Sequence, residues 1–281
     1  MIILEIKTIH ANSFKILIES LKECLTDVNF QFEKKQIVDG LQLGGLSIVS
    51  LNNSSSILVH LKLNAFNFEY YYCEKDKLNL GINVVYLFKL IKTINNNDIL
   101  TLFVDDEDIN KLGIRIENAE RNYLSTYKLN LMDLDSNDFS IPPTEFSSII
   151  TMSSHEFHKI CKDLNNISDK VEIKNINQKL IFTANGEIAS NEIIFGETTN
   201  RLKIESNNNN EIIQGIYDLK NLTVFTKCTN LCQSINIYMK NDYPLVIKYS
   251  IGTLGFIHLC LSSITNNINQ INNSDSDSDS D

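Results

Sequence analysis

The chain has 281 residues, a formal net charge of −10, and an apolar fraction of 43% that is ordinary for a globular protein. This length is sufficient for a substantial core and for two domains. No run approaches the ~20 apolar residues that cross a bilayer, so we expect no membrane-spanning helix. Residues 1–6 alternate without a basic lead-in, which predicts a strand rather than a signal peptide.

The predicted elements occur twice, and the equivalent pairs Gly81-Ile82 and Gly215-Ile216 lie 134 residues apart. Apolar periodicity predicts four amphipathic helices, at residues 11–25, 84–94, 154–167 and 218–229. Alternating apolar residues predict strands at residues 1–6, 46–50, 57–63, 99–104, 112–117, 180–184, 192–195, 234–239 and 245–251. The repeat predicts an α+β protein with two similar domains, each an antiparallel sheet with two helices on one face.

The boundaries between these parts follow from composition. We expect an N-terminal domain over residues 1–130, a connector over residues 131–143 and a C-terminal domain over residues 144–266. The connector contains Pro142 and Pro143 after an acidic stretch, which is typical of an extended segment. Residues 267–281 alternate Ser and Asp after an Asn-rich stretch and are expected to be disordered. This tail is either a solubilising segment or a substrate for an acidophilic kinase.

The predicted helices place lysines opposite their apolar stripes. Lys89 and Lys92 lie three residues apart in a helix without acidic residues, and Lys159 and Lys162 repeat this spacing in the second half. The candidate DNA-binding residues are Lys15, Lys22, Lys89, Lys92, Lys159, Lys162, Lys220 and Lys227. One such face is most simply a solvated helix surface, but four in an acidic protein indicate a polyanionic partner, with DNA as the leading candidate.

Residue patterns typical of catalysis or metal binding are missing from the sequence. Gly44-Gly45 lacks the Lys-Ser/Thr that follows in a phosphate-binding loop, and His155 and His158 lack the metalloprotease spacing. Cys228 and Cys232 have no second pair of ligands nearby, so we expect no metal and no cofactor. The six cysteines are dispersed and are interpreted as reduced thiols of an intracellular protein. We therefore expect a protein that is not an enzyme.

Several stretches together resemble the proliferating cell nuclear antigen family of DNA sliding clamps. They are Leu131-Met-Asp-Leu-Asp with Ile141-Pro142, Glu156-Phe157 through Leu164, Ala184-Asn-Gly186-Glu187-Ile188, Phe225-Thr226-Lys227, and Pro244 through Tyr249. The resemblance covers residues 3–264, apart from a longer segment around residues 31–44. It implies a homotrimeric ring of six similar domains, with duplex DNA passing through without sequence readout and the lysines above, apart from Lys220, facing the hole.

The resemblance also implies protein-binding sites. The partner-peptide pocket maps to Leu51, Leu131, Phe139, Ile141, Pro142, Phe146, Pro244 and Cys260. Cys260-Leu-Ser-Ser departs from the family's aromatic-Leu-Ala-Pro, so we expect a roomier or more polar pocket there. Edge strands over residues 122–131 and 188–195 carry the subunit interface through Tyr127, Leu129, Ile188 and Ile193. The implied partners are DNA polymerase, a clamp loader and peptides of the type that binds proliferating cell nuclear antigen.

This resemblance implies a polymerase processivity factor located in the nucleus, or in a viral replication compartment if a virus encodes it. Two alternatives stay open. A checkpoint-type subunit would form a heterotrimer, and divergent edge strands would favour it. A clamp-like interaction protein would not encircle DNA, and loss of the pore lysines would be its signature.

Overall fold

The computed structural model describes residues 1–135, 141, 143–196, 202–206 and 211–264. Phe139, Pro142 and the predicted acidic tail lie outside these described residues. The chain divides into two compact units. Unit 1 comprises residues 1–53, 59–140 and 250–257, and unit 2 comprises residues 54–58, 141–249 and 258–281. The boundary between the two largest segments, at residues 140 and 141, falls inside the predicted connector. The predicted domain limits at residues 130, 144 and 266 remain predictions.

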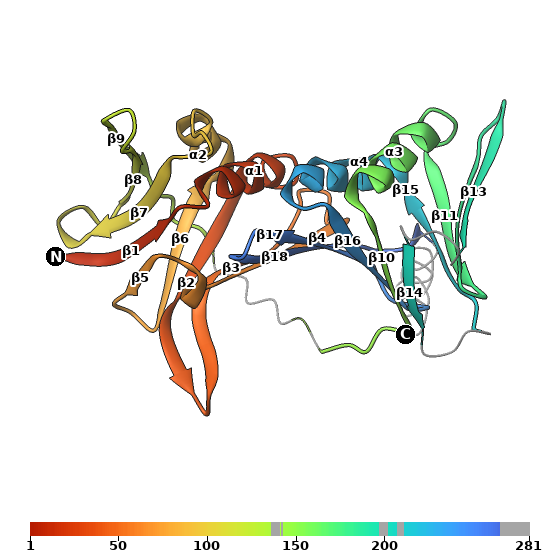
Figure 1. The fold of residues 1–281 in the computed structure, drawn as a ribbon, viewed down its shortest axis with the longest axis horizontal. Helices are drawn as coiled ribbons and strands as arrows, with labels where there is room; N and C mark the ends of the chain where they lie inside the picture. The colour runs from red at the N-terminus through yellow and green to blue at the C-terminus, as the bar shows by residue number, and fades with distance from the viewer. Residues whose placement is uncertain (136–140, 142, 197–201, 207–210, 265–281) are drawn as a thin grey trace, which may run out of the picture. The chain divides into compact units, whose positions relative to one another are not determined.

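The same order of helices and strands occurs in both halves of the chain (Figure 1). The paired strands of both halves run antiparallel to each other. The first half contains β1 (Ile2–Thr8), α1 (Ala11–Leu21), β2 (Asp27–Val38), β3 (Leu41–Leu51), β4 (Ile57–Asn64), η1 (Ala65–Asn67), β5 (Tyr70–Cys73), β6 (Lys77–Asn83), α2 (Val84–Ile91), β7 (Ile99–Asp105), η2 (Asp106–Asp108), β8 (Lys111–Asn118) and β9 (Tyr123–Asn130). The second contains β10 (Ser148–Ser153), α3 (Ser154–Asn165), β11 (Lys170–Ile176), β12 (Lys179–Asn185), β13 (Ser190–Gly196), β14 (Leu202–Ser206), β15 (Ile213–Asp218), α4 (Leu219–Phe225), η3 (Thr226–Leu231), β16 (Ser234–Met239), β17 (Leu245–Ile251) and β18 (Gly255–Leu261).

Unit 1 contains a five-stranded sheet in the order β5-β1-β7-β8-β9, and β2 pairs with both β3 and β6. Helices α1 and α2 pack against each other and bury Phe14, Leu17, Leu87 and Ile91. Strand β1 alternates buried and partly exposed residues after its first residue, and β7 and β8 alternate apart from three consecutive buried residues in each. This is the pattern expected when one face of a sheet covers a core. The core of unit 1 therefore lies between its strands and these two helices.

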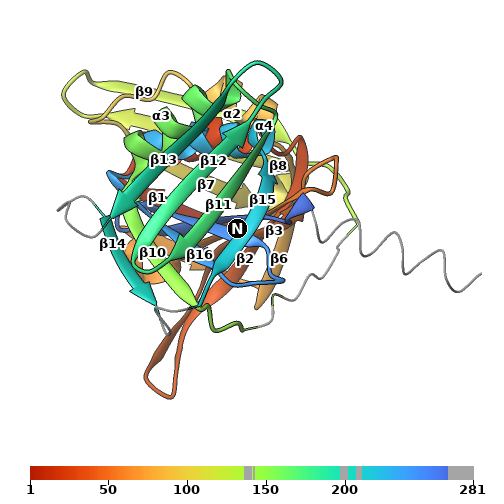
Figure 2. The same cartoon turned by 90° about the vertical axis from the view of Figure 1, so that its right-hand side faces the viewer.

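Unit 2 contains a four-stranded sheet in the order β13-β12-β11-β15. Strand β10 lies between β14 and β16, and β16 also pairs with β17. Figure 2 shows β13, β12, β11 and β15 side by side in that order. Helix α3 buries Phe157, Ile160 and Leu164, and it packs against α4 and η3. The predicted α+β class with two helices in each repeat is confirmed.

All four predicted helices end early in the structure, and α2 ends at Ile91 rather than residue 94 and α3 at Asn165 rather than residue 167. Helix α1 ends at Leu21 rather than residue 25, because Cys24 N–H turns back to Leu21 O at 2.9 Å while buried Leu25 continues the apolar pattern outside the helix. Helix α4 ends at Phe225, and a 3₁₀ helix follows in which the Thr226 and Thr229 hydroxyls donate to carbonyls three residues earlier. Threonine hydroxyls compete for the backbone in this way. Periodicity of apolar residues predicts burial here, but not helix type.

Within the described residues, no helix combines the length and apolar character needed to cross a membrane.

Candidate nucleic-acid interface

The clearest candidate surface in unit 1 is the exposed face of α2. Lys89 and Lys92 are exposed there, while Leu87 and Ile91 on the opposite side are fully buried. Asn83 caps the helix, since its side-chain oxygen accepts the Tyr86 N–H at 3.0 Å. The Lys89 ammonium lies 4.6 Å from the centroid of the exposed Tyr86 ring. This arrangement orients one lysine through a cation–π contact and leaves the face positive.

The lysines of α1 are less available than those of α2. Lys15 Nζ donates to Ile94 O at 2.6 Å, which ties α1 to the segment that follows α2. Lys22 Nζ pairs with Glu23 at 2.5 Å, lies 5.0 Å from the Phe88 ring, and has only 24% of its side chain exposed. Both ammonium groups thus have partners within the protein, which the helical spacing in the sequence does not reveal.

The corresponding surface of unit 2 is the exposed face of α3. His158, Lys159 and Lys162 are exposed there, opposite buried Phe157 and Cys161. Lys162 lies in the last turn, where a cation is favoured by the helix dipole. The two lysine pairs therefore occupy equivalent helix faces in the two units.

The remaining two predicted lysines belong to the α4 region. Lys220 forms an exposed ion pair with Asp169 at 3.7 Å, and both side chains are about three-quarters exposed at 74% and 75%. Lys227 lies on η3 and is exposed. An exposed ion pair of this kind contributes little to the stability of the fold, so Lys220 can readily exchange Asp169 for another anion.

The predicted partner-pocket residues are divided between the two units. In unit 1, Leu51 is exposed at the end of β3. Leu131 lines a pocket of about 420 Å³ with neighbours that were not predicted, including Leu78, Met132 and Asp133. Gly81 allows this close packing, because a Cβ there would lie 2.2 Å from Met132 O.

In unit 2, an aromatic cluster surrounds one predicted pocket residue. The Phe146 ring lies 5.3 Å from the Tyr238 ring, which in turn contacts the His258 ring at 6.1 Å. Ile141 is exposed, and Pro244 and Cys260 are half-buried. Burial raises the pKa of the Cys260 thiol to about 12, so this group is neutral at physiological pH. Tyr238 and His258 were not predicted, although aromatic residues on alternate strand positions could have indicated them.

The predicted interface residues lie on or beside free sheet edges. Strand β9 ends the five-stranded sheet of unit 1 and carries half-buried Tyr127 and Leu129. Strand β13 ends its sheet in unit 2 and carries half-buried Ile193. Ile188 lies outside the strand, because Gly186 N–H donates to Ala189 O at 2.9 Å in a turn and β13 begins at Ser190.

Both edge strands also expose apolar residues that were not predicted. Leu124 of β9 is 64% exposed and Ile194 of β13 is 54% exposed. Ile188 beside β13, which was predicted, is 100% exposed. Unpaired strand edges with exposed apolar side chains tend to pair with another strand.

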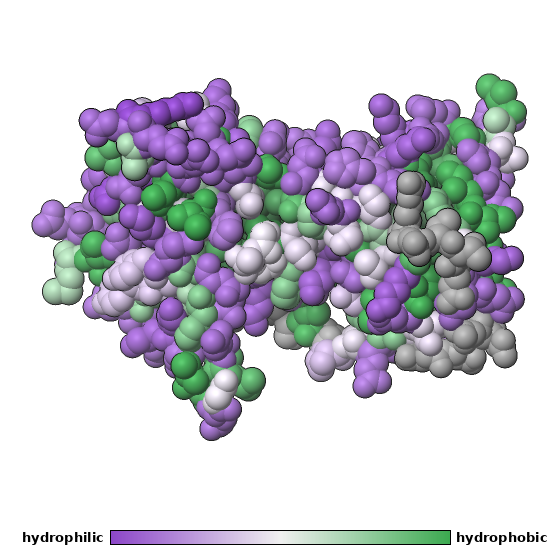
Figure 3. Space-filling view, viewed as in Figure 1, coloured by the Kyte–Doolittle hydropathy of each residue, from purple (hydrophilic) through white to green (hydrophobic). Residues whose placement is uncertain are grey.

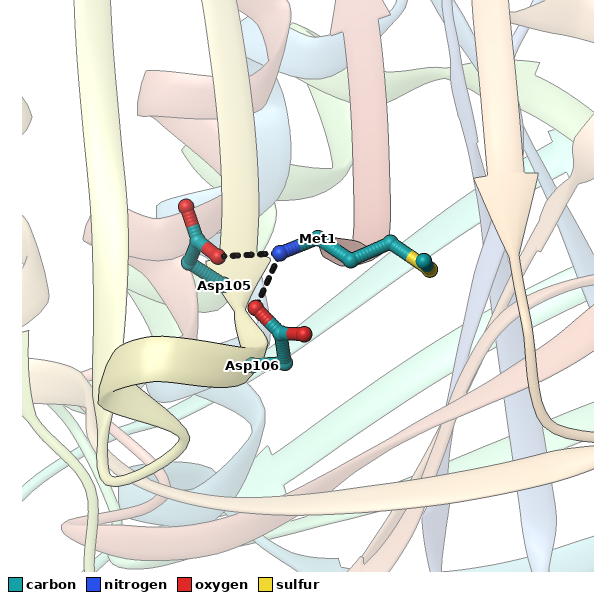
Figure 4. Close-up of polar contacts among 3 residues, drawn as sticks. All are labelled: Met1, Asp105 and Asp106. Carbon is teal, nitrogen blue, oxygen red and sulfur yellow. Dashed lines mark hydrogen bonds and ion pairs between the residues drawn. The ribbon is translucent and has the colours of Figure 1, made fainter.

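The acidic loop at residues 105–108 pairs with nearby cations. The N-terminal ammonium of Met1 contacts Asp105 Oδ1 at 3.1 Å and also Asp106 Oδ1 (Figure 4). The hydrogen bond to Asp106, and then that to Asp105, raise the pKa of the ammonium group. The ammonium group in turn lowers the pKa of Asp105. Among the described residues, no group of His, Cys, Asp and Glu side chains is arranged to hold a metal ion.

Comparison with known proteins identifies the family. The N-terminal domain of proliferating cell nuclear antigen matches residues 3–138, and its C-terminal domain matches residues 140–264. A probable DNA polymerase sliding clamp 1 of Paramecium bursaria Chlorella virus 1 is 30% identical over 94% of this chain and 97% of its own length. A probable DNA polymerase sliding clamp of Acanthamoeba polyphaga mimivirus is 36% identical over 79% of this chain, and the match spans about half, 48%, of that relative. The chain therefore belongs to the proliferating cell nuclear antigen family of DNA sliding clamps.

Proposed function

We propose that this protein is a DNA polymerase processivity factor, a non-catalytic clamp that encircles duplex DNA and tethers the polymerase. The observation that carries this proposal is the repetition of one exposed basic helix face, Lys89 with Lys92 on α2 and Lys159 with Lys162 on α3. Lysines that contact phosphates bind without reading sequence, and such contacts break and re-form readily. Enclosure then holds the clamp on DNA while these weak contacts permit sliding.

The ring is proposed to be a homotrimer closed by pairing β9 of one copy with β13 of the next. By element order, β18 is the counterpart of β9, and β4 is the counterpart of β13. Within unit 1, the start of β18 lies tightly against β4, since a Cβ on Gly255 would lie 2.0 Å from Lys62 O. This packing supports the same strand combination between copies, and a closed ring would remove both exposed edges.

Partner proteins are proposed to dock beside the connector, on the surface that includes Ile141, Phe146, Pro244 and Cys260 in unit 2. Exposed Ile141 and the Phe146–Tyr238 ring pair offer an apolar surface for the aromatic anchors of a short peptide. A clamp loader and the cognate polymerase are the expected partners. The two viral relatives support a role in viral replication.

The test replaces Lys89, Lys92, Lys159 and Lys162 with alanine and measures processive synthesis by the polymerase on a primed circular template. We expect shorter products and a weaker dependence of synthesis on salt, because phosphate contacts are lost. The matched control replaces four exposed lysines away from the helices, namely Lys75, Lys77, Lys179 and Lys203. Equal product lengths for both quadruple variants would refute the assignment of the helix faces to DNA.

A further inference from the structure

The β2–β3 hairpin extends beyond the sheet to which its base belongs. Its tip, residues 33–43, is entirely exposed. Asp39 and Gly40 form the turn with φ of 51° and 78°, the geometry that Asp-Gly favours in two-residue hairpins. The base is held by Tyr71, whose hydroxyl lies 2.7 Å from Glu33 O and 2.8 Å from Gly45 O and shares its one proton between these two carbonyls. The hairpin is therefore anchored at one end and free at the other.

Apolar side chains gather on one face of this hairpin. The register pairs Val38 with Leu41 and Gln36 with Leu43, so Val38, Leu41 and Leu43 share a face. Their exposed fractions are 44%, 66% and 38% respectively. Figure 3 shows apolar colour on the projecting β2–β3 hairpin. Isolated exposed apolar residues are common, but three neighbours on a projecting ribbon indicate a binding surface.

The outer edge of β2 is also unpaired along this stretch. Pairing with β6 ends at Glu33 and Lys77, followed by one hydrogen bond from Lys34 N–H to Asp76 O. Beyond that point, no described strand pairs with β2 except β3. Since the two-residue turn makes the Val38–Leu41 pair a hydrogen-bonded one, the backbone N–H and C=O of Ile37 point outward. The edge can therefore accept an added strand.

The charges at the hairpin select what kind of strand would fit. Lys34 and Lys35 are exposed at the base, and Lys35 Nζ lies 4.5 Å from the Phe66 ring. The Glu33 carboxylate already accepts a hydrogen bond from Gln31 at 2.8 Å. Lys34 and Lys35 therefore offer two exposed ammonium groups at the base, beside the carboxylates of Glu33 and Asp76, whereas the exposed apolar side chains lie nearer the tip.

The size of the ribbon argues against a second copy of this chain as the occupant. From strand spacing and rise, two hairpins with arms of about five residues would bury on the order of 300–400 Å² of surface, counting both partners. A stable interface between two folded proteins buries about 1,200–2,000 Å². A short peptide needs much less area, because main-chain hydrogen bonds supply part of the affinity.

We propose that the β2–β3 hairpin binds an extended segment of a partner protein, which adds as a strand to the β2 edge. The segment has alternating apolar residues over Val38, Leu41 and Leu43, and it carries carboxylates where it passes Lys34 and Lys35. This surface shares no residue with the helix faces or with the predicted partner-peptide pocket, so it would recruit a partner through contacts of its own.

The experiment titrates the isotope-labelled full-length protein with the synthetic peptide acetyl-TVTVTVDD-amide and follows backbone amide shifts by NMR. We expect shifts at residues 34–43. The triple variant V38T/L41T/L43T keeps β-formers but removes the apolar face, and should weaken binding at least ~10-fold, equivalent to about 1.4 kcal/mol. The matched control is I37T, because Ile37 is 65% exposed but faces the opposite side. A peptide with lysines in place of the aspartates should also bind more weakly.

Three outcomes would overturn the proposal. The first is the absence of shifts in the hairpin, and the second is equal weakening by I37T and the triple variant. The third is a change in oligomer mass, by light scattering, caused by the triple variant without any effect on peptide binding. That result would assign the hairpin to contacts between copies of this chain.

Discussion

At the residue scale, the partners of each lysine decide how available its charge is. Lys89, Lys92, Lys159 and Lys162 are exposed on their helices. Lys15 instead donates to the Ile94 carbonyl just beyond α2. A lysine whose ammonium already has a close partner must give up that contact before it binds a phosphate. We therefore expect the α2 and α3 lysines to dominate DNA contact, with smaller effects from Lys15 and Lys22.

The carboxylate of Asp108 provides a prediction at this scale. Lys111 Nζ at 3.0 Å, and then Lys128 Nζ at 3.2 Å, lower the pKa of this group. Its ion pairs therefore stabilise the fold above the ordinary aspartate pKa of about 3.9, and this contribution is lost as the pH falls through the lowered pKa. NMR titration of the side-chain carboxyl should give a midpoint below 3.9 in the wild type.

The variant Lys111→Ala should move the Asp108 midpoint upward, because the larger of the two favourable contacts is removed. Lys77→Ala, which removes an exposed lysine from β6, serves as the control and should leave the midpoint unchanged. An unaltered midpoint in Lys111→Ala would show that this ion pair does not persist in solution.

At the element scale, the glycines at the base of the hairpin have a structural role. The pairing of β2 with β3 shifts between Glu33 and Gln36, opposite Gly44 and Gly45, whose φ angles are 96° and 133°. Such a bulge requires residues that tolerate positive φ. The Gly-Gly pair that lacks a phosphate-binding signature is thus explained by backbone geometry.

Gly45→Ala should destabilise unit 1 strongly. The added Cβ would lie 2.0 Å from Leu63 O, at a backbone conformation that alanine rarely adopts. Strained backbone alone costs about 1–3 kcal/mol, and the clash adds to this. Chemical denaturation should show a lower midpoint. Gly196→Ala is the matched control, since a Cβ there meets nothing within 4 Å, and it should be nearly neutral. Equal midpoints for the two variants would contradict the observed bulge.

At the scale of the whole molecule, the exposed edges β9 and β13 determine the expected assembly. A double variant, Tyr127→Asp with Ile193→Asp, would place unpaired charges in the proposed interface, which is costly without partners. Light scattering should then report the 32.0 kDa mass of one chain in place of three. Ile109→Asp, at a site 56% exposed and outside the edge strands, is the control and should leave the mass unchanged. A wild-type protein that is monomeric at every concentration would argue against a self-closing ring.

Much of the fold could be predicted because its signals are local. The apolar stripes of α2 and α3 follow from helical periodicity, and strands β16 and β17 have the predicted bounds. The edge strand around Tyr127 was also located from the resemblance. The hairpin was missed as an element, although Asp39-Gly40 between apolar residues is a strong turn signal. Helix ends were overestimated, because periodicity continues into turns that still bury side chains.

The amino-acid sequence by itself determined the doubled α+β organisation, the buried helix stripes and the lysines opposite them, since each depends on residues a few positions apart. Tertiary structure alone decided which of those lysines are engaged, because Lys15 meets a carbonyl 79 residues away and Lys220 meets Asp169. It also decided which strands are edges and left Val38, Leu41 and Leu43 exposed on the hairpin. These properties depend on contacts between distant segments, which local spacing does not encode.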